Sequence, residues 1–208
     1  MNQCPHNLDL WQWLCGMPVK VHAKMKFGKY HDIEVEDDVV ATVEYENGAM
    51  GTFITSTAYS PGTNRLEIVC DGGSLICEKN QLILNKLGKL ESVFTKENES
   101  PYASPPCKSE IVQTDGKNEQ HSGVLNAFAA SILRGEPLVA DGREGIKGLT
   151  LSNAMHLSAW TETEVKIPFD EKQFKDLLEE RIKTSKIKEN VKYVFSEFDK
   201  NHGNLCFL

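Results

Sequence analysis

The sequence predicts an α+β fold: an open, mostly antiparallel β-sheet with helices packed on one of its faces. Three observations support this prediction. Residues 19–94 contain short strand-like runs joined by turn dipeptides, which is typical of hairpins and meanders. Helical periodicity is found before this region and again after it, from about residue 122. Strand and helix patterns therefore do not alternate as parallel β-α-β units would require.

The composition is that of an ordinary globular protein. The 208 residues are 40% hydrophobic and 25% charged, which allows a sizeable core without disulfides or metals. The net charge of −7 disfavours binding to nucleic acid or to an anionic membrane. No apolar run approaches the ~20 residues that span a bilayer. Six scattered cysteines without C-x-x-C favour a reduced, cytoplasmic protein. We expect no metal site, because Cys4 and His6 lack a second pair at ligand spacing.

The first predicted helix occupies the stretch between Pro5, which suits a first helical turn, and Gly16, which suits the left-handed residue after a helix. Its apolar stripe would consist of Leu8, Trp11, Leu14 and Cys15. Asn2, His6 and Asp9 share one polar face if the helix runs back through Asn2. An imidazole flanked by polar groups on a rigid element is suited to proton transfer, but a surface histidine gives the same pattern.

The clearest local signal is Asn47-Gly48 between two strand-like runs, which predicts a two-residue hairpin turn. Pairing outward from this turn sets Tyr45 opposite Met50. One face of the hairpin would then carry Val39, Ala41, Val43, Tyr45, Met50, Thr52 and Ile54, and the outer face Val40, Thr42, Glu44, Gly51, Phe53 and Thr55. The apolar Phe53 on the outer face predicts self-association through it, as a homodimer or larger. The alternative is that the tail after Ser185 covers this face.

The segments before and after the hairpin predict further strands, loops and helices. Before the hairpin, a strand over residues 19–27 leads into an acidic connection, Glu34 to Asp38, which lacks calcium-loop spacing and predicts a solvated turn. After it, the loop around Pro61-Gly62 offers Tyr59 and Arg65 as contacts for a sugar hydroxyl, although such residues more often hold a loop in place. A meander over residues 66–86, a long loop over 95–110, two helices, an edge strand near 165–168 and a last helix from residue 170 follow.

Five strings together resemble one known family. They are NQCPHNLDLWQWLCGMP, VEDDVVATVEYENGAMGTF, STAYSPGTNRLEI, HSGVLNAFAASILRGEPL and GREGIKGLTLSNAMHLSAW, and the resemblance covers roughly residues 2–182. The chain resembles the C-terminal domain of the glucose–fructose oxidoreductase/inositol dehydrogenase (Gfo/Idh/MocA) family. The resemblance implies that His6 is catalytic and that Asp9 supports the site. Asn2 stands where many members carry a catalytic aspartate, and an amide can bond a substrate hydroxyl but cannot accept its proton.

The resemblance also implies what this sequence lacks. The family's Rossmann domain carries a G-x-G-x-x-G turn for the pyrophosphate and a catalytic lysine, and neither can be identified here. We therefore expect no NAD or NADP to bind this chain alone. The implied parent is an NAD(P)-dependent oxidoreductase acting on a sugar, polyol or sugar derivative. Residues 1–185 would be its substrate-binding and oligomerisation domain, and residues 186–208 match no family pattern. The alternative is a non-catalytic homo-oligomeric binding module.

Overall fold

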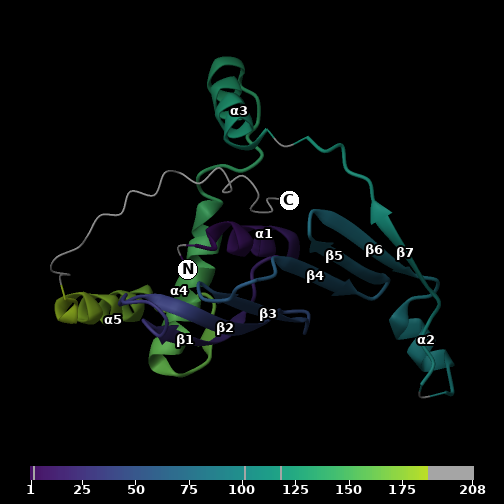
Figure 1. Cartoon of the computed structure of the whole chain (residues 1–208), viewed down its shortest axis with the longest axis horizontal. Helices are drawn as coiled ribbons and strands as arrows, with labels where there is room; N and C mark the ends of the chain where they lie inside the picture. The colour runs from purple at the N-terminus through teal and green to yellow at the C-terminus, as the bar shows by residue number, and fades with distance from the viewer. Residues whose placement is uncertain (2, 101, 118, 187–208) are drawn as a thin grey trace. The chain divides into compact units, whose positions relative to one another are not determined.

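A computed structural model describes the chain except for residues 2, 101, 118 and 187–208 (Figure 1). The described residues form two compact units, residues 1–60 with 127–186, and residues 61–126. The first unit contains α1 (Pro5–Cys15), β1 (Lys20–Phe27), β2 (Glu36–Glu44), β3 (Met50–Ser56), α4 (Gly145–Thr161), β8 (Val165–Lys166) and α5 (Glu171–Thr184). The second contains β4 (Arg65–Cys70), β5 (Gly73–Glu78), β6 (Gln81–Leu87), α2 (Glu91–Glu97) and β7 (Cys107–Val112). The helix α3 (Gln120–Arg134) begins in the second unit and ends in the first.

The sheet of the first unit is antiparallel, with strand order β3-β2-β1-β8. Its inner face is covered by α1 and α4, which also pack against each other (Figure 1). The core between sheet and helices is apolar and consists of Leu8, Trp11, Val21, Ala23, Met25, Val39, Ala41, Val43, Leu151, Ala154, Met155, Leu157 and Val165. The predicted α+β fold is therefore confirmed, although the strands form two four-stranded sheets and not one.

The predicted register of the hairpin is wrong by one residue. Glu44 lies opposite Met50 and Ala41 opposite Phe53. The amide of Tyr45 bonds the carbonyl oxygen of Ala49 at 2.9 Å, and Gly48 has φ +82°, so three residues and not two form the loop. A shift of one residue turns every side chain of β3 to the opposite face. The outer face accordingly carries Val40, Thr42 and Glu44, as predicted, but with Met50, Thr52 and Ile54 in place of Gly51, Phe53 and Thr55.

Phe53 instead faces the core, where its ring stacks on Trp11 with centroids 5.9 Å apart and planes 13° apart. Gly51 is needed beside it, because a Cβ there would lie 2.6 Å from the Trp11 ring. On α1 the predicted stripe is correct for Leu8 and Trp11 and wrong for Leu14, which is 47% exposed. The polar Gln12 is buried instead, one position beyond Trp11.

The second unit is an antiparallel meander with strand order β4-β5-β6-β7. Its register places apolar side chains on both faces: one face carries Leu66, Ile68, Leu75, Cys77, Leu82, Leu84 and Val112, and the other Val69, Ile76, Ile83 and Ile111. The other face carries a hydrogen-bonded ladder in which Asn85 joins Ser74 at 3.0 Å and Ser109 at 2.6 Å. The prediction of an unbroken loop over residues 95–110 is wrong, because α2 reaches Glu97 and β7 begins at Cys107.

The later helices fall close to their predicted places. The helix α3 has its predicted apolar residues exposed by 56% to 77%: Val124, Phe128, Ile132 and Leu133. The helix α4 begins at Gly145, after a turn in which Asp141 accepts a hydrogen bond from the Arg143 amide at 2.8 Å. The helix α5 is capped by Asp170, which accepts from the Lys172 amide at 2.9 Å. None of the described helices has the length and apolar character to cross a membrane.

Candidate functional site

The candidate site lies on the exposed side of α1. Because Leu8 and Trp11 are buried against the sheet, His6 and Asp9 lie on the solvent side of the same helix. Nε2 of the Gln12 side chain donates to Oδ1 of Asp9 at 2.9 Å, which fixes the direction of this carboxylate. A side chain at Gly148 of α4 would come within 3.8 Å of the Asp9 Cα, so α4 packs closely at this point. The structure thus holds His6 and Asp9 on a firmly anchored helix.

The other predicted site residues are Asn2, Tyr59 and Arg65. The helix begins at Pro5, and Asn2 lies outside the described residues, so the predicted polar face of three residues is described only for His6 and Asp9. Tyr59 is 66% exposed in the loop after β3. Arg65 lies in the second unit, where its guanidinium pairs with Glu67 at 2.7 Å and Glu78 at 3.0 Å. Substrate contact by Tyr59 or Arg65 stays a prediction.

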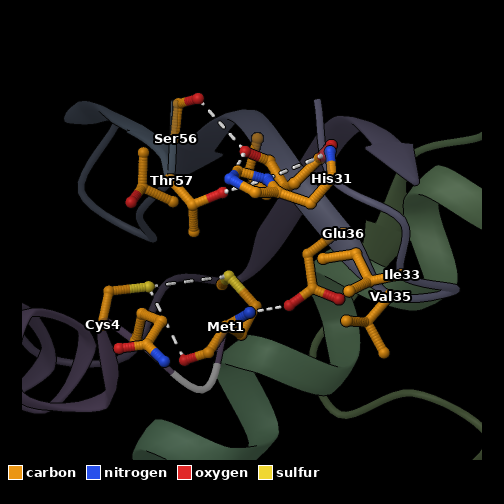
Figure 2. A pocket seen from close by; sticks show the side chains of 12 residues that line it. Met1, Cys4, His31, Ile33, Val35, Glu36, Ser56 and Thr57 are labelled. Carbon is orange, nitrogen blue, oxygen red and sulfur yellow. Dashed lines mark hydrogen bonds and ion pairs between the residues drawn. The ribbon is translucent and has the colours of Figure 1, made fainter. Parts of the chain in front are cut away.

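A cavity of about 300 Å³ opens beside the first residues of the chain, just before α1 (Figure 2). It is lined by Met1, Gln3, Cys4, His31, Ile33, Val35, Glu36, Asp37, Val39, Thr55, Ser56 and Thr57. In Figure 2, Ser56, Thr57 and His31 lie on one side, across from Met1 and Cys4, with Ile33 and Val35 near Glu36. Burial raises the pKa of the Cys4 thiol, which disfavours the reactive thiolate.

Asp37 is the most deeply buried carboxylate of this cavity, with no part of its side chain exposed. Its Oδ2 accepts from the amides of Tyr30 at 2.6 Å and His31 at 3.1 Å. Burial opposes its ionisation, but the backbone N–H groups of Tyr30, Lys29 and His31 outweigh burial and hold the pKa of Asp37 below its ordinary value. The prediction of a solvated acidic turn is therefore wrong for Asp37.

Glu36 lines the cavity and also pairs with a histidine of α4. Its Oε2 lies 3.0 Å from Nε2 of His156 on α4, and its other oxygen forms an ion pair with the amino group of Met1. The second ring nitrogen of His156 lies 2.9 Å from the Ser152 carbonyl oxygen, so this Nδ1 carries a hydrogen. Burial lowers the pKa of His156, and the hydrogen bond to Ser152 opposes that shift.

Sequence patterns could have identified Asp37 as an inward-facing residue, but not the polar residues that lie beside it in the cavity. Every second residue of β2 faces inward, as do Val39, Ala41 and Val43. Asp37 stands two residues before Val39, so the same alternation directs it inward. No comparable signal identifies His31 or Thr57, because they lie in loops. Across the residues that the structure describes, no group of three His, Cys, Asp or Glu side chains could hold a metal ion.

This geometry, an open antiparallel sheet backed by two helices with an exposed histidine and a nearby cavity, defines an α+β domain. Residues 1–76 match the family model described as "GFO/IDH/MocA C-terminal domain". The resemblance predicted from the sequence is therefore confirmed, and the matched residues include α1 with His6 and Asp9. Among curated proteins the search found no match.

Solved structures with the same fold come from several bacteria. One is the WlbA dehydrogenase from Bordetella pertussis in complex with NADH and UDP-GlcNAcA, with 22% identity, a TM-score of 0.52, and coverage of 82% of this chain and 45% of that one. Another is the UDP-N-acetylglucosamine 3-dehydrogenase GnnA from Acidithiobacillus ferrooxidans, with 19% identity, a TM-score of 0.60, and coverage of 76% and 47%. A putative NADPH-dependent oxidoreductase from Desulfitobacterium hafniense has 16% identity, a TM-score of 0.63, and coverage of 80% and 47%. At these identities the likeness establishes the fold, and the chain spans about half the length of these relatives.

Proposed function

We propose that this chain is the substrate-binding and assembly portion of an NAD(P)-dependent oxidoreductase acting on a sugar, polyol or sugar derivative. The observation that carries the proposal is the match of residues 1–76 to the family's C-terminal domain, which includes the helix with the exposed His6. Two of the solved relatives named above act on or bind UDP-linked amino sugars. These relatives support the proposed substrate class for this chain.

The proposed chemistry assigns the chain's own residues a limited part. When bound in the complete enzyme, the nicotinamide cofactor would exchange a hydride with the substrate carbon. His6 would take the proton of the substrate hydroxyl, because a neutral imidazole nitrogen can accept a proton and this side chain is exposed on α1. Asp9, held by Gln12, would support the polar side of that helix. No G-x-G-x-x-G turn is found in this sequence, so we place the cofactor's pyrophosphate on another segment or partner.

The test uses the native protein, expressed in its own organism and isolated through a C-terminal tag. Reduction of NAD⁺ and NADP⁺ is followed with UDP-N-acetylglucosamine, its uronic acid, free sugars and inositol. We expect turnover with at least one substrate and a fall in kcat of about 10²–10⁴-fold in His6→Ala, with a smaller change in KM. His121→Ala, an exposed histidine of α3, is the matched control. Wild-type turnover in His6→Ala would refute the assignment.

The second candidate is a non-catalytic homo-oligomeric binding module. It is favoured by the outer face of the first sheet, where Val40, Met50 and Ile54 are 47%, 81% and 70% exposed. Val40 and Ile54 lie opposite each other on the two strands, and exposed apolar patches often mark an interaction surface. If the chain sediments as a dimer or larger, Ile54→Glu should shift it toward monomer, whereas Thr52→Glu beside it introduces the same charge without removing apolar area. A module of this kind would lack turnover with every substrate above.

A further inference from the structure

We propose that the C-terminal tail of this chain, over residues 187–198, forms an amphipathic helix that covers the outer face of the first sheet. The tail lies outside the described residues, and the proposal is independent of the function proposed above. It assigns an occupant to an apolar surface that the described residues leave exposed. A tail in this place competes with a second copy of the chain for the same surface, so assembly through that face requires the tail to leave.

The outer face of the first sheet carries an apolar patch that is exposed among the described residues. Val40 and Ile54 lie opposite each other on β2 and β3 and are 47% and 70% exposed. Thr42 and Thr52 form a second exposed pair two residues further along both strands. We call these four residues the outer patch. Water is a poor solvent for adjacent apolar side chains, so the outer patch is a surface to which an apolar segment can bind.

The sequence of the tail has the pattern of a helix with one apolar side. Its apolar residues recur at spacings of three and four, namely Ile187, Val191, Val194, Phe195 and Phe198. At 3.6 residues per turn these five side chains fall within an arc of about 100°. The opposite side carries Glu189, Lys192 and Ser196. A single helix cannot bury its own apolar side, so this segment needs an apolar surface elsewhere.

Hydrogen bonds at the end of α5 hold the start of the tail beside the sheet. Oγ of Ser185 donates to one carboxylate oxygen of Glu34, and the amide of Lys186 donates to the other oxygen at 3.0 Å. Glu34 stands two residues before β2, the strand that carries Val40. Ser185 has an extended backbone, with φ −65° and ψ 140°, and serine is among the residues preferred immediately before a helix. A new helix can therefore begin directly after this anchor.

The length of the tail matches the distance from its anchor to the outer patch. Val40 stands four residues after Glu36, the first residue of β2, which is about 13 Å along a strand. A helix over residues 187–198 is about 18 Å long, so from Glu34 it passes over Val40 and Ile54. A short tether of this kind gives an effective concentration of about 1 mM or more. The tail of the same chain is therefore favoured over a second copy as the occupant.

Charged residues at the edges of the two surfaces are complementary in sign. Lys24 lies beside Val40 on β1, in the row that Ile54 completes, and Lys26 follows on the same face of β1. Glu197 and Asp199 flank the apolar side of the tail, one on each side. Exposed ion pairs add little affinity, but they favour one orientation of a docked segment over others. The lysine row therefore favours a tail with acidic flanks.

The experiment measures how fast a maleimide labels the thiol of Ile54→Cys in the complete chain, by peptide mass spectrometry. The exposed Cys70 of the second unit is the reference thiol. Phe198→Glu places a charge at the centre of the apolar side of the tail, so position 54 should label at least about fivefold faster than with the wild-type tail. Tyr193→Glu is the matched control, because Tyr193 lies outside that side, and it should leave the rate unchanged. The slow labelling should be the same at about 1 µM and about 100 µM protein, since the contact is intramolecular.

Three outcomes would overturn the proposal. Equal labelling rates with the wild-type and Phe198→Glu tails would mean that the tail does not cover Ile54. Equal acceleration by Phe198→Glu and Tyr193→Glu would mean that the apolar side of the tail does not make the contact. Slow labelling only at high protein concentration would identify a second copy as the occupant. The buried Cys4 reports on folding and should stay unlabelled throughout; if Ile54→Cys exposes it, Val40→Cys takes its place with the same expected rates.

Discussion

Truncation of two neighbouring residues of β3 tests the register on which the first unit depends. Phe53 is partly buried and stacks on Trp11, whereas Ile54 is 70% exposed on the outer face. Truncating a fully buried phenylalanine costs about 3–5 kcal/mol, of which about 0.5–1.5 kcal/mol belongs to an aromatic pair. Because Phe53 keeps some exposure, we expect Phe53→Ala to lower the free energy of unfolding by about 2–3 kcal/mol. Ile54→Ala should change it by less than about 0.5 kcal/mol.

The assay is urea and thermal unfolding of both variants, followed by tryptophan fluorescence. Trp11 and Trp160 both lie in the first unit, so their fluorescence reports on that unit. For a chain of this length a loss of 1 kcal/mol lowers Tm by roughly 2–4 °C, so Phe53→Ala should melt about 4–12 °C lower than wild type. A larger loss in Ile54→Ala than in Phe53→Ala would refute the register and restore the pairing expected for a two-residue turn.

Three further outcomes follow from the structure. Ser158→Ala should lower the free energy of unfolding in urea by about 2–4 kcal/mol. Oγ of the buried Ser158 accepts from the Ala23 amide at 2.9 Å and donates to the Thr163 carbonyl oxygen at 2.5 Å, so both backbone groups would lose a partner. Burial, with a contribution from Cys15, raises the pKa of Tyr45 to about 12, so the difference in stability between wild type and Tyr45→Phe should be constant up to about pH 10, and wild type should lose stability relative to Tyr45→Phe between about pH 10 and 12. Calorimetry should detect no micromolar binding of NAD⁺ or NADP⁺ to the chain alone; such binding would contradict the assignment of the pyrophosphate site to another segment.

The fold could be predicted from the sequence because its main signals are local. Pro5 and Gly16 bound α1, alternation marks β1 and β2, and the Asn47-Gly48 turn joins β2 to β3. The register of that hairpin could not be predicted, since Asn-Gly suits both a two-residue and a three-residue loop. What separates them is long-range packing: Trp11 of α1 lies over Gly51, and Phe53 stacks beside it. Such contacts between distant segments leave no mark in the alternation of one strand.

The site was only partly predictable, for a similar reason. His6 and Asp9 follow from helical spacing and from the family resemblance, both of which are local in sequence. The polar wall of the cavity depends on a loop closing over a strand end, where the amides of Tyr30 and His31 meet the carboxylate of Asp37. In sequence Asp37 is one member of an acidic run, and although alternation along β2 directs it inward, its pairing with the amides of Tyr30 and His31 leaves no signal in the sequence.

The hairpin register and the direction of His6 are linked through the same packing contact. Trp11 fits against the sheet only because Gly51 lacks a side chain at the point of contact. With Trp11 and Leu8 directed inward, the helical period directs His6 to the opposite side and Asp9 to the flank next to Gly148 of α4. A slip of one residue in β3 would replace Gly51 with Met50 or Thr52 under Trp11, and the helix would have to rotate or lift. The orientation of the candidate catalytic histidine is therefore determined by a glycine 45 positions further along the chain.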